Sequence, residues 1–186
     1  MKHRFPFKPG FLILLCSLLL IASLPASAAE IDIAGQGLSL RLPLSLDVLT
    51  RDMARDDPVL LLYGITSAQA RQQLIHEGVV LKAREITGAY TLTLSVRDAG
   101  DADFAGMDGE TLAEAAEKMG AVGYEVLSSR QTNFLLFFDN SGSRAACVTR
   151  LGGEEYTLEL LCQGAAASYA DVLRGVALSM NFTAGQ

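Results

Sequence analysis

A two-residue alternation of apolar and polar side chains does most to limit what this chain can fold into. In residues 90–97 the apolar members are Tyr90, Leu92, Leu94 and Val96, and the residues between them are Thr or Ser. A shorter stretch of the same alternation runs from Val79 to Arg84. A period of two with one polar face is typical of half-buried antiparallel strands. Residues 79–97 therefore predict a hairpin within an antiparallel sheet.

Further strands are predicted on both sides of this hairpin. Residues 31–34 and 38–42 form an opening hairpin around Gly35-Gln36-Gly37, and residues 46–50 are either a strand or a turn of helix. Four strands follow later in quick succession, at 124–130, 133–138, 144–151 and 155–162. Because residues 134–138 are apolar throughout, we expect that strand in the middle of the sheet with both faces covered.

Helices are predicted where end signals frame an apolar stripe. Asp57-Pro58 opens a short helix over 59–63, and Thr66 with Gln69 forms a capping box for a helix that runs to about residue 77. Two further helices are expected at 109–119 and 168–182. No linker or repeat interrupts the series. Residues 29–186 are thus predicted to be one α+β domain with an antiparallel sheet packed by helices.

Composition narrows the class of protein and its partners. Half of the residues are hydrophobic and 19% are charged, which is too apolar for a disordered chain. Fifteen Lys and Arg stand against 21 Asp and Glu, for a net charge of −6. This acidic balance argues against a nucleic-acid partner, which would be held by basic side chains on its phosphates.

The N-terminus has the three parts of a secretory signal peptide. Lys2, Arg4 and Lys8 give a positive start, residues 11–24 are apolar, and small residues follow Pro25. The apolar run is shorter than the roughly 20 residues that cross a bilayer, which disfavours an uncleaved anchor. We predict a signal peptide at 1–28, cleaved after Ala28 or, as second choice, after Ala29.

Export is the expectation that follows from the signal peptide. Cys16 is preceded by two leucines and followed by more apolar sequence, so it does not mark a lipoprotein. Removing three basic residues leaves twelve against 21 acidic ones, a net charge of −9. The mature chain is expected on the extracellular or cell-envelope side, with no membrane span after cleavage.

The order of elements resembles the PsbP-like superfamily, and more closely small exported proteins of Gram-positive bacteria with such a domain. The resemblance rests on residues 46–58 (LDVLTRDMARDDP), the strand start at 78–81, and the ending at 169–182 (YADVLRGVALSMNF). It implies an α/β/α sandwich over nearly all of the mature chain. Members of that fold mostly bind other proteins, so the resemblance implies a protein partner. It implies no particular functional residue.

Residues that could carry catalysis or bind a metal are few. His76 is the single histidine of the mature chain, and its predicted place in the last turn of a helix suits an imidazole beside the helix dipole. The sequence has no CxxC, HExxH or G-x-S-x-G pattern. Cys147 shares a strand face with leucines, which favours a core thiol over a nucleophile paired with His76. No catalytic residue and no cofactor is predicted.

One acidic loop is a weak calcium candidate. Asp98, Asp101 and Asp103 supply carboxylate oxygens of the kind calcium takes. Measured against an EF-hand loop starting at Asp101, however, Leu112 stands where a bidentate Glu belongs. A solvated loop, with Asp108 capping the next helix, explains the same residues.

The two mature cysteines are predicted to be free. Export favours a disulfide, but a two-residue turn at Gly152-Gly153 would place Cys147 opposite Leu158 and Cys162 opposite Ser143. The two thiols would then lie four residues out of step, roughly 13 Å along the strands. A disulfide needs Cα atoms within about 7 Å.

Three functions are compatible with these observations. The first is an exported, non-enzymatic module that binds a protein or another envelope component. The second is a carrier of a small ligand, which predicts a deep apolar pocket between the sheet and the helices. The third is a hydrolase with two carboxylates whose pKa values are pushed apart. The missing catalytic motifs favour the first.

Overall fold

A computed structural model describes residues 28–100, 102–121 and 123–183. The predicted signal peptide lies outside the described residues except for Ala28, the first residue of β1. The strands are β1 (Ala28–Ile33), β2 (Leu38–Pro43), β3 (Leu46–Thr50), β4 (Leu81–Glu85), β5 (Tyr90–Asp98), β6 (Tyr124–Ser128), β7 (Asn133–Phe138), β8 (Arg144–Leu151), β9 (Glu154–Cys162) and β10 (Asn181–Phe182). The helices are α2 (Pro58–Tyr63), α3 (Ser67–His76), α4 (Gly109–Lys118) and α5 (Ala170–Ser179), with a 3-10 turn at Ala166–Tyr169.

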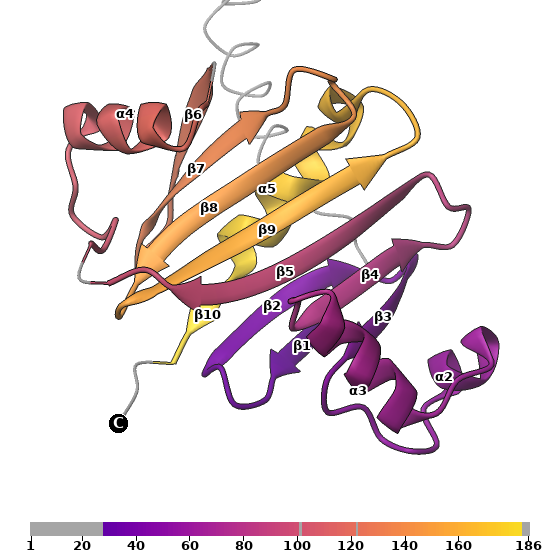
Figure 1. Cartoon of the computed structure of the whole chain (residues 1–186). Helices are drawn as coiled ribbons and strands as arrows, with labels where there is room; N and C mark the ends of the chain where they lie inside the picture. The colour runs from indigo at the N-terminus through magenta and orange to yellow at the C-terminus, as the bar shows by residue number, and fades with distance from the viewer. Residues whose placement is uncertain (1–27, 101, 122, 184–186) are drawn as a thin grey trace, which may run out of the picture.

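Seven strands form one antiparallel sheet in the order β3-β4-β5-β9-β8-β7-β6 (Figure 1). Hairpins join most of the neighbouring strands. Strand β9 pairs with β8 on one side and with β5 on the other, so it links the two halves of the sheet. A second, three-stranded sheet has the order β1-β2-β10. The predicted α+β class, with an antiparallel sheet packed by helices, is confirmed.

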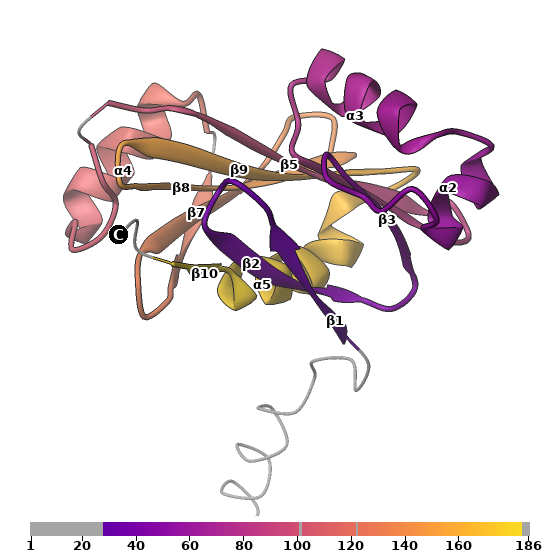
Figure 2. The same ribbon diagram turned by 90° about the horizontal axis from the view of Figure 1, so that it is seen from below.

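One face of the large sheet, here the inner face, is covered over its middle strands. The alternating apolar residues of β5 and β9 point to this side, and Leu92, Leu94, Leu158 and Leu160 are completely buried. Helix α5 and the small sheet lie against them (Figure 2). Leu40 and Leu42 of β2 and Leu173 of α5 complete this core.

The opposite, outer face is covered at its two ends. At one end, Leu60 of α2 and Leu74 of α3 pack with Leu49 of β3. At the other end, Leu112 of α4 packs with Leu135 and Val148 of the sheet. The helices leave the middle strands of this face open to solvent.

The predicted helix starts are confirmed in detail. The Asp57 side chain accepts a hydrogen bond from the backbone N–H of Val59, with Pro58 as the first helical residue. Thr66 and Gln69 form the expected capping box. Asp108 accepts from the N–H of Thr111 and so begins α4 as an N-cap.

Several boundaries differ from the prediction, including the first strand, which spans Ala28–Ile33 instead of 31–34. The last helix ends at Ser179, because Asn181–Phe182 pairs with β2 and becomes strand β10. Strand β4 begins at Leu81 instead of Val79, and β6 ends at Ser128 because a tight turn follows. The undecided segment 46–50 is strand β3.

The prediction for residues 134–138 is correct in part. Strand β7 does lie between two strands, and Phe134, Leu135 and Leu136 are buried on both faces. Phe137 and Phe138 are only half-buried. Strand β7 lies next to the edge strand β6, where the helices on the two faces of the sheet cover these side chains only in part.

Candidate functional site

The candidate site is the open middle of the outer face. Cross-strand register places Lys82, Thr93, Glu159 and Ala146 in one row across β4, β5, β9 and β8. On β5 and β9, the outward side chains between the helices are polar except Leu161, and none of them is buried. This strip is therefore a solvated sheet surface between two helical walls.

Two ion pairs cross this surface between β8 and β9. The Nη2 atom of Arg144 lies 2.6 Å from Oε2 of Glu159, and that of Arg150 lies 2.8 Å from Oε2 of Glu155. The carboxylate of Glu159 raises the pKa of Arg144 through a hydrogen bond and by charge. Both pairs are partly exposed, so we expect each to contribute at most about 1 kcal/mol to stability.

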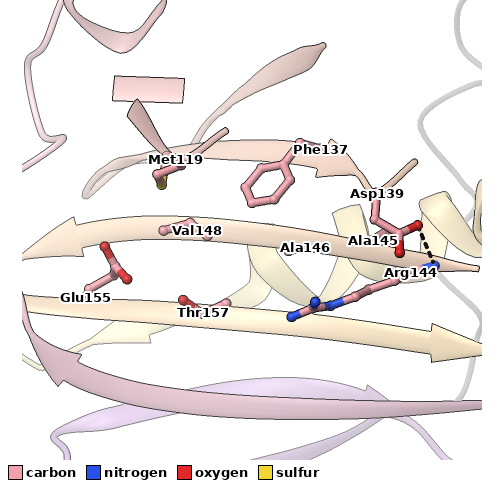
Figure 3. Close-up of a pocket in the computed structure, with 9 residues that line it drawn as sticks. All are labelled: Met119, Phe137, Asp139, Arg144, Ala145, Ala146, Val148, Glu155 and Thr157. Carbon is pink, nitrogen blue, oxygen red and sulfur yellow. Dashed lines mark hydrogen bonds between the residues drawn. The ribbon is translucent and has the colours of Figure 1, made fainter. Parts of the chain in front are cut away.

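A hollow of about 330 Å³ lies on this face beside the C-terminal end of α4. Its lining residues are Met119, Phe137, Asp139, Arg144, Ala145, Ala146, Val148, Glu155 and Thr157. In Figure 3, Met119 and Phe137 lie on the β7 side of Val148, and Glu155 and Thr157 project from β9 on its other side. The hollow thus has an apolar floor and a charged rim.

Hydrogen bonds hold the rim where β7 turns into β8. The Asp139 carboxylate accepts hydrogen bonds from the Ser141 hydroxyl and from the backbone N–H of Arg144. The bond from Ser141, with the backbone bonds, lowers the pKa of Asp139 below its usual value. Asp139 is therefore charged at neutral pH and holds the turn that presents Arg144.

The loop before α4 closes one end of the outer face through a residue that sequence reasoning missed. Phe104 is fully buried, and its N–H donates to the carbonyl of Arg150. The guanidinium of Arg150 lies 5.3 Å from the centre of the Phe104 ring, within cation–π range. The acidic composition of this loop gave no sign that one aromatic side chain would anchor it.

The calcium candidates do not form a cluster in the part of the chain that is described. Asp98 accepts from the N–H of Gly100, and Asp103 accepts from the N–H of Gly153 at 3.4 Å. Asp101 lies outside the described residues. Within those residues, no group of three or more His, Cys, Asp or Glu side chains could hold a metal ion.

The residues considered for nucleophilic chemistry lie apart from the hollow's exposed rim. His76 ends α3, as predicted. Cys147 is buried in the inner-face core, and burial raises the pKa of its thiol, with a smaller effect from Glu125. A thiol with a raised pKa stays protonated at neutral pH and is a poor nucleophile.

The predicted register of the cysteines is confirmed. Cys147 lies opposite Leu158, and the N–H of Cys162 donates to the carbonyl of Ser143. Both cysteines are buried and free in the structure. Their redox state in solution stays a prediction: alkylation under denaturing conditions without reductant should add one label to each thiol.

A second hollow, of about 690 Å³, lies between residues 128–131 and 178–181. The Gln131 side chain in this hollow has a structural role. It accepts a hydrogen bond from the N–H of Phe182 and donates one to the carbonyl of Phe182. Gln131 thereby fixes β10. We take the smaller hollow as the site because its charged and apolar groups face solvent together.

Neither a protein-family model nor a curated protein matches the chain. Among solved structures, it is similar to the solution structure of cyanobacterial PsbP (CyanoP) from Synechocystis sp. PCC 6803, with 12% sequence identity and a TM-score of 0.47. The match covers 87% of this chain and 95% of that one.

The closer likeness to exported proteins of Gram-positive bacteria stays a prediction. Across residues 28–100, 102–121 and 123–183, none of the helices combines the length and the apolar character that a membrane crossing requires.

Proposed function

We propose that this chain is an exported, non-enzymatic module that binds another protein through the outer face of its seven-stranded sheet. The observation that carries the proposal is the hollow beside α4, where apolar and charged side chains face solvent together. Export rests on the signal peptide predicted at 1–28.

The side chains around the hollow are of the kinds that protein interfaces favour. Aromatic residues, Met and Arg are enriched at such interfaces, and Phe137, Met119 and Arg144 are the corresponding residues here. Phe137 and Met119 are half-buried, so a partner that covers them removes apolar surface from water. Arg144, which is paired with Glu159, and Glu155, which is paired with Arg150, supply a polar rim around that apolar centre.

The non-enzymatic part of the proposal has its support in the carboxylates around the hollow. Glu155 is paired with Arg150, and Asp139 is held charged by the turn that it stabilises. A hydrolase of the kind considered above needs one carboxylate with a raised pKa beside an ionised one. These groups are better placed to recognise a partner than to transfer a proton.

Site-specific photo-cross-linking in the secreting cell tests this proposal. A photoreactive residue at Thr157, in the hollow, is compared with the same residue at Ile86, an exposed site in the β4–β5 turn. We expect Thr157 to give one discrete protein adduct and Ile86 to give none. Equal adducts from both positions, or none from Thr157, would contradict the proposal.

A small-ligand carrier is the second candidate, because about 330 Å³ lies at the lower end of the range of ligand pockets. The space between the sheet and α5, where such a pocket was expected, is filled by buried leucines of β5 and β9. Thermal unfolding against lipids, sugars and nucleotides distinguishes the two. A ligand at 100 times its Kd adds about 2.7 kcal/mol, whereas a protein-binding module shows no shift.

A further inference from the structure

Strand β6 is an open edge of the large sheet within the described residues, and four of its five residues are exposed. Tyr124 and Val126 are apolar residues on this edge with 41% and 37% of their surface accessible. A free strand edge presents unpaired N–H and C=O groups that can pair with another strand.

The other strand edges are protected in ways that β6 is not. Strand β3, at the opposite edge, is half-buried, and helices α2 and α3 pack on its Leu49. Strand β1 exposes the acidic residues Glu30 and Asp32, which repel a second copy. Strand β10 has only two residues. Acidic side chains, short length and cover are the usual means of protecting an edge. Within the described residues, β6 has neither the helical cover of β3 nor the two unpaired acidic residues of β1, and its single acidic residue, Glu125, is ion-paired.

The hairpin fixes which backbone groups of β6 face outward. The N–H of Ser129 donates to the carbonyl of Thr132, so hydrogen-bonded pairs with β7 alternate from there to Leu127 and Glu125. The N–H and C=O groups of Tyr124, Val126 and Ser128 therefore point to the free edge.

We propose that β6 pairs antiparallel with β6 of a second copy of this chain, about a two-fold axis at Val126. Val126 then lies opposite its own copy, and Tyr124 lies opposite Ser128 of that copy. Apolar β-branched pairs across strands are favourable, and an isologous contact of this kind closes as a dimer. The two sheets become one continuous sheet.

Charge permits this self-pairing at β6 despite the acidic chain. Glu125 is the single charged residue of β6, and its Oε2 lies 2.7 Å from Nη2 of Arg174. Arg174 also pairs with Asp171 of its own helix, so each copy brings to the contact a Glu125 carboxylate that is already ion-paired. In the proposed register Glu125 faces Leu127 of the other copy, so the two glutamates are not opposed.

Sedimentation of the purified protein over a range of concentrations tests the proposal. The average mass should rise from one chain towards two, and Val126→Lys should abolish the rise by placing two ammonium groups against each other. Leu161→Lys, on the outer face of β9 with 53% exposure, is the matched control and should leave the rise unchanged. A mass of one chain at every concentration, or a dimer that survives Val126→Lys, would overturn the proposal.

A cysteine variant keeps the test independent of any folding defect in Val126→Lys. Paired Val126 Cα atoms would lie about 5.5 Å apart, within disulfide range. Val126→Cys should form an intermolecular disulfide on mild oxidation, while the buried Cys147 and Cys162 do not react. Leu161→Cys should form no intermolecular disulfide. Absence of a cross-link at position 126, or its appearance only with a different protein, would also refute self-pairing.

Discussion

The two faces of the seven-stranded sheet are built from the same strands but have different surroundings. On β9, the inward residues Leu158 and Leu160 are fully buried, whereas the adjacent outward residues Thr157 and Glu159 are partly exposed. Both sets of side chains belong to one alternating run. The difference shows that a period of two assigns each residue to a face, while the helices decide how much of that face is covered.

This contrast separates stability from recognition within single strands. The inner face buries its side chains against α5 and the small sheet, so changes there should act on folding. The outer face is covered only near its ends, so changes in its middle should act on binding. Matched substitutions on the two faces therefore test the account.

The largest effect is expected for Leu158→Ala. Leu158 is completely buried, and its truncation should leave a cavity that lowers the free energy of unfolding by about 2–5 kcal/mol. Leu161→Ala is the control, because it makes the same change on the exposed side of β9; its effect should stay below about 1 kcal/mol. Urea denaturation of both variants measures the difference, and equal losses would show that the two faces are not distinct.

A smaller loss is expected where the inner face carries a polar side chain. The buried Thr149 hydroxyl lies 2.8 Å from Oγ1 of Thr132 and donates to the carbonyl of Asn133. Thr149→Val removes these bonds and should lower the free energy of unfolding by about 1–3 kcal/mol.

The matched control is Thr157→Val on the outer face, which should change that free energy by no more than about 0.5 kcal/mol. Thermal or urea unfolding of the two variants gives the comparison. A neutral Thr149→Val would mean that the hydroxyl pair has no role in holding β8 to the neighbouring hairpin.

The assignment of residues to the two faces can be predicted from the sequence, whereas the covering of each face cannot. The alternation in residues 90–97 predicts the faces of β5, and the turn at Gly152-Gly153 predicts the register that puts Cys147 opposite Leu158. The covering of each face depends on contacts between distant residues, which no local pattern contains.

The candidate site could not be predicted for the same reason. Met119 follows α4, Phe137 belongs to β7 and Thr157 to β9, so the hollow exists only after these elements pack. Phe104 anchors a loop whose sequence is otherwise acidic and small. The last turn of the predicted helix became β10 because pairing of Phe182 with Leu38 replaced helical bonds.

An intermediate effect is expected for the helices that wall the outer face. Thr66→Ala removes the N-cap of α3 and should cost about 1 kcal/mol of unfolding free energy, because the N–H of Gln69 loses its partner. Gln72→Ala changes an exposed position of the same helix and should cost no more than about 0.5 kcal/mol. Differential scanning calorimetry measures both, and a neutral Thr66→Ala would show that packing alone fixes this wall.

The smallest effect on stability, with the largest effect on binding, is expected at Arg144. Its ion pair with Glu159 is partly exposed, so Arg144→Ala should lower the unfolding free energy by less than about 1 kcal/mol. The same change removes one side of the hollow's rim and should reduce the cross-link from position 157 severalfold. Arg71→Ala, on the exposed side of α3, should not reduce it. Equal cross-link yields from the two variants would show that Arg144 takes no part in binding the partner.

The central claim is that the open outer face meets a partner, and side-chain oxidation by hydroxyl radicals tests it most directly. The purified protein is oxidised alone and in the presence of the cell-envelope fraction, and labelling is compared at Met119 and Phe137 against the exposed Leu61 and Leu62 of α2. The account predicts that the envelope fraction lowers oxidation of Met119 and Phe137 and leaves Leu61 and Leu62 unchanged. Unchanged oxidation at Met119 and Phe137, or protection confined to α2, would contradict it.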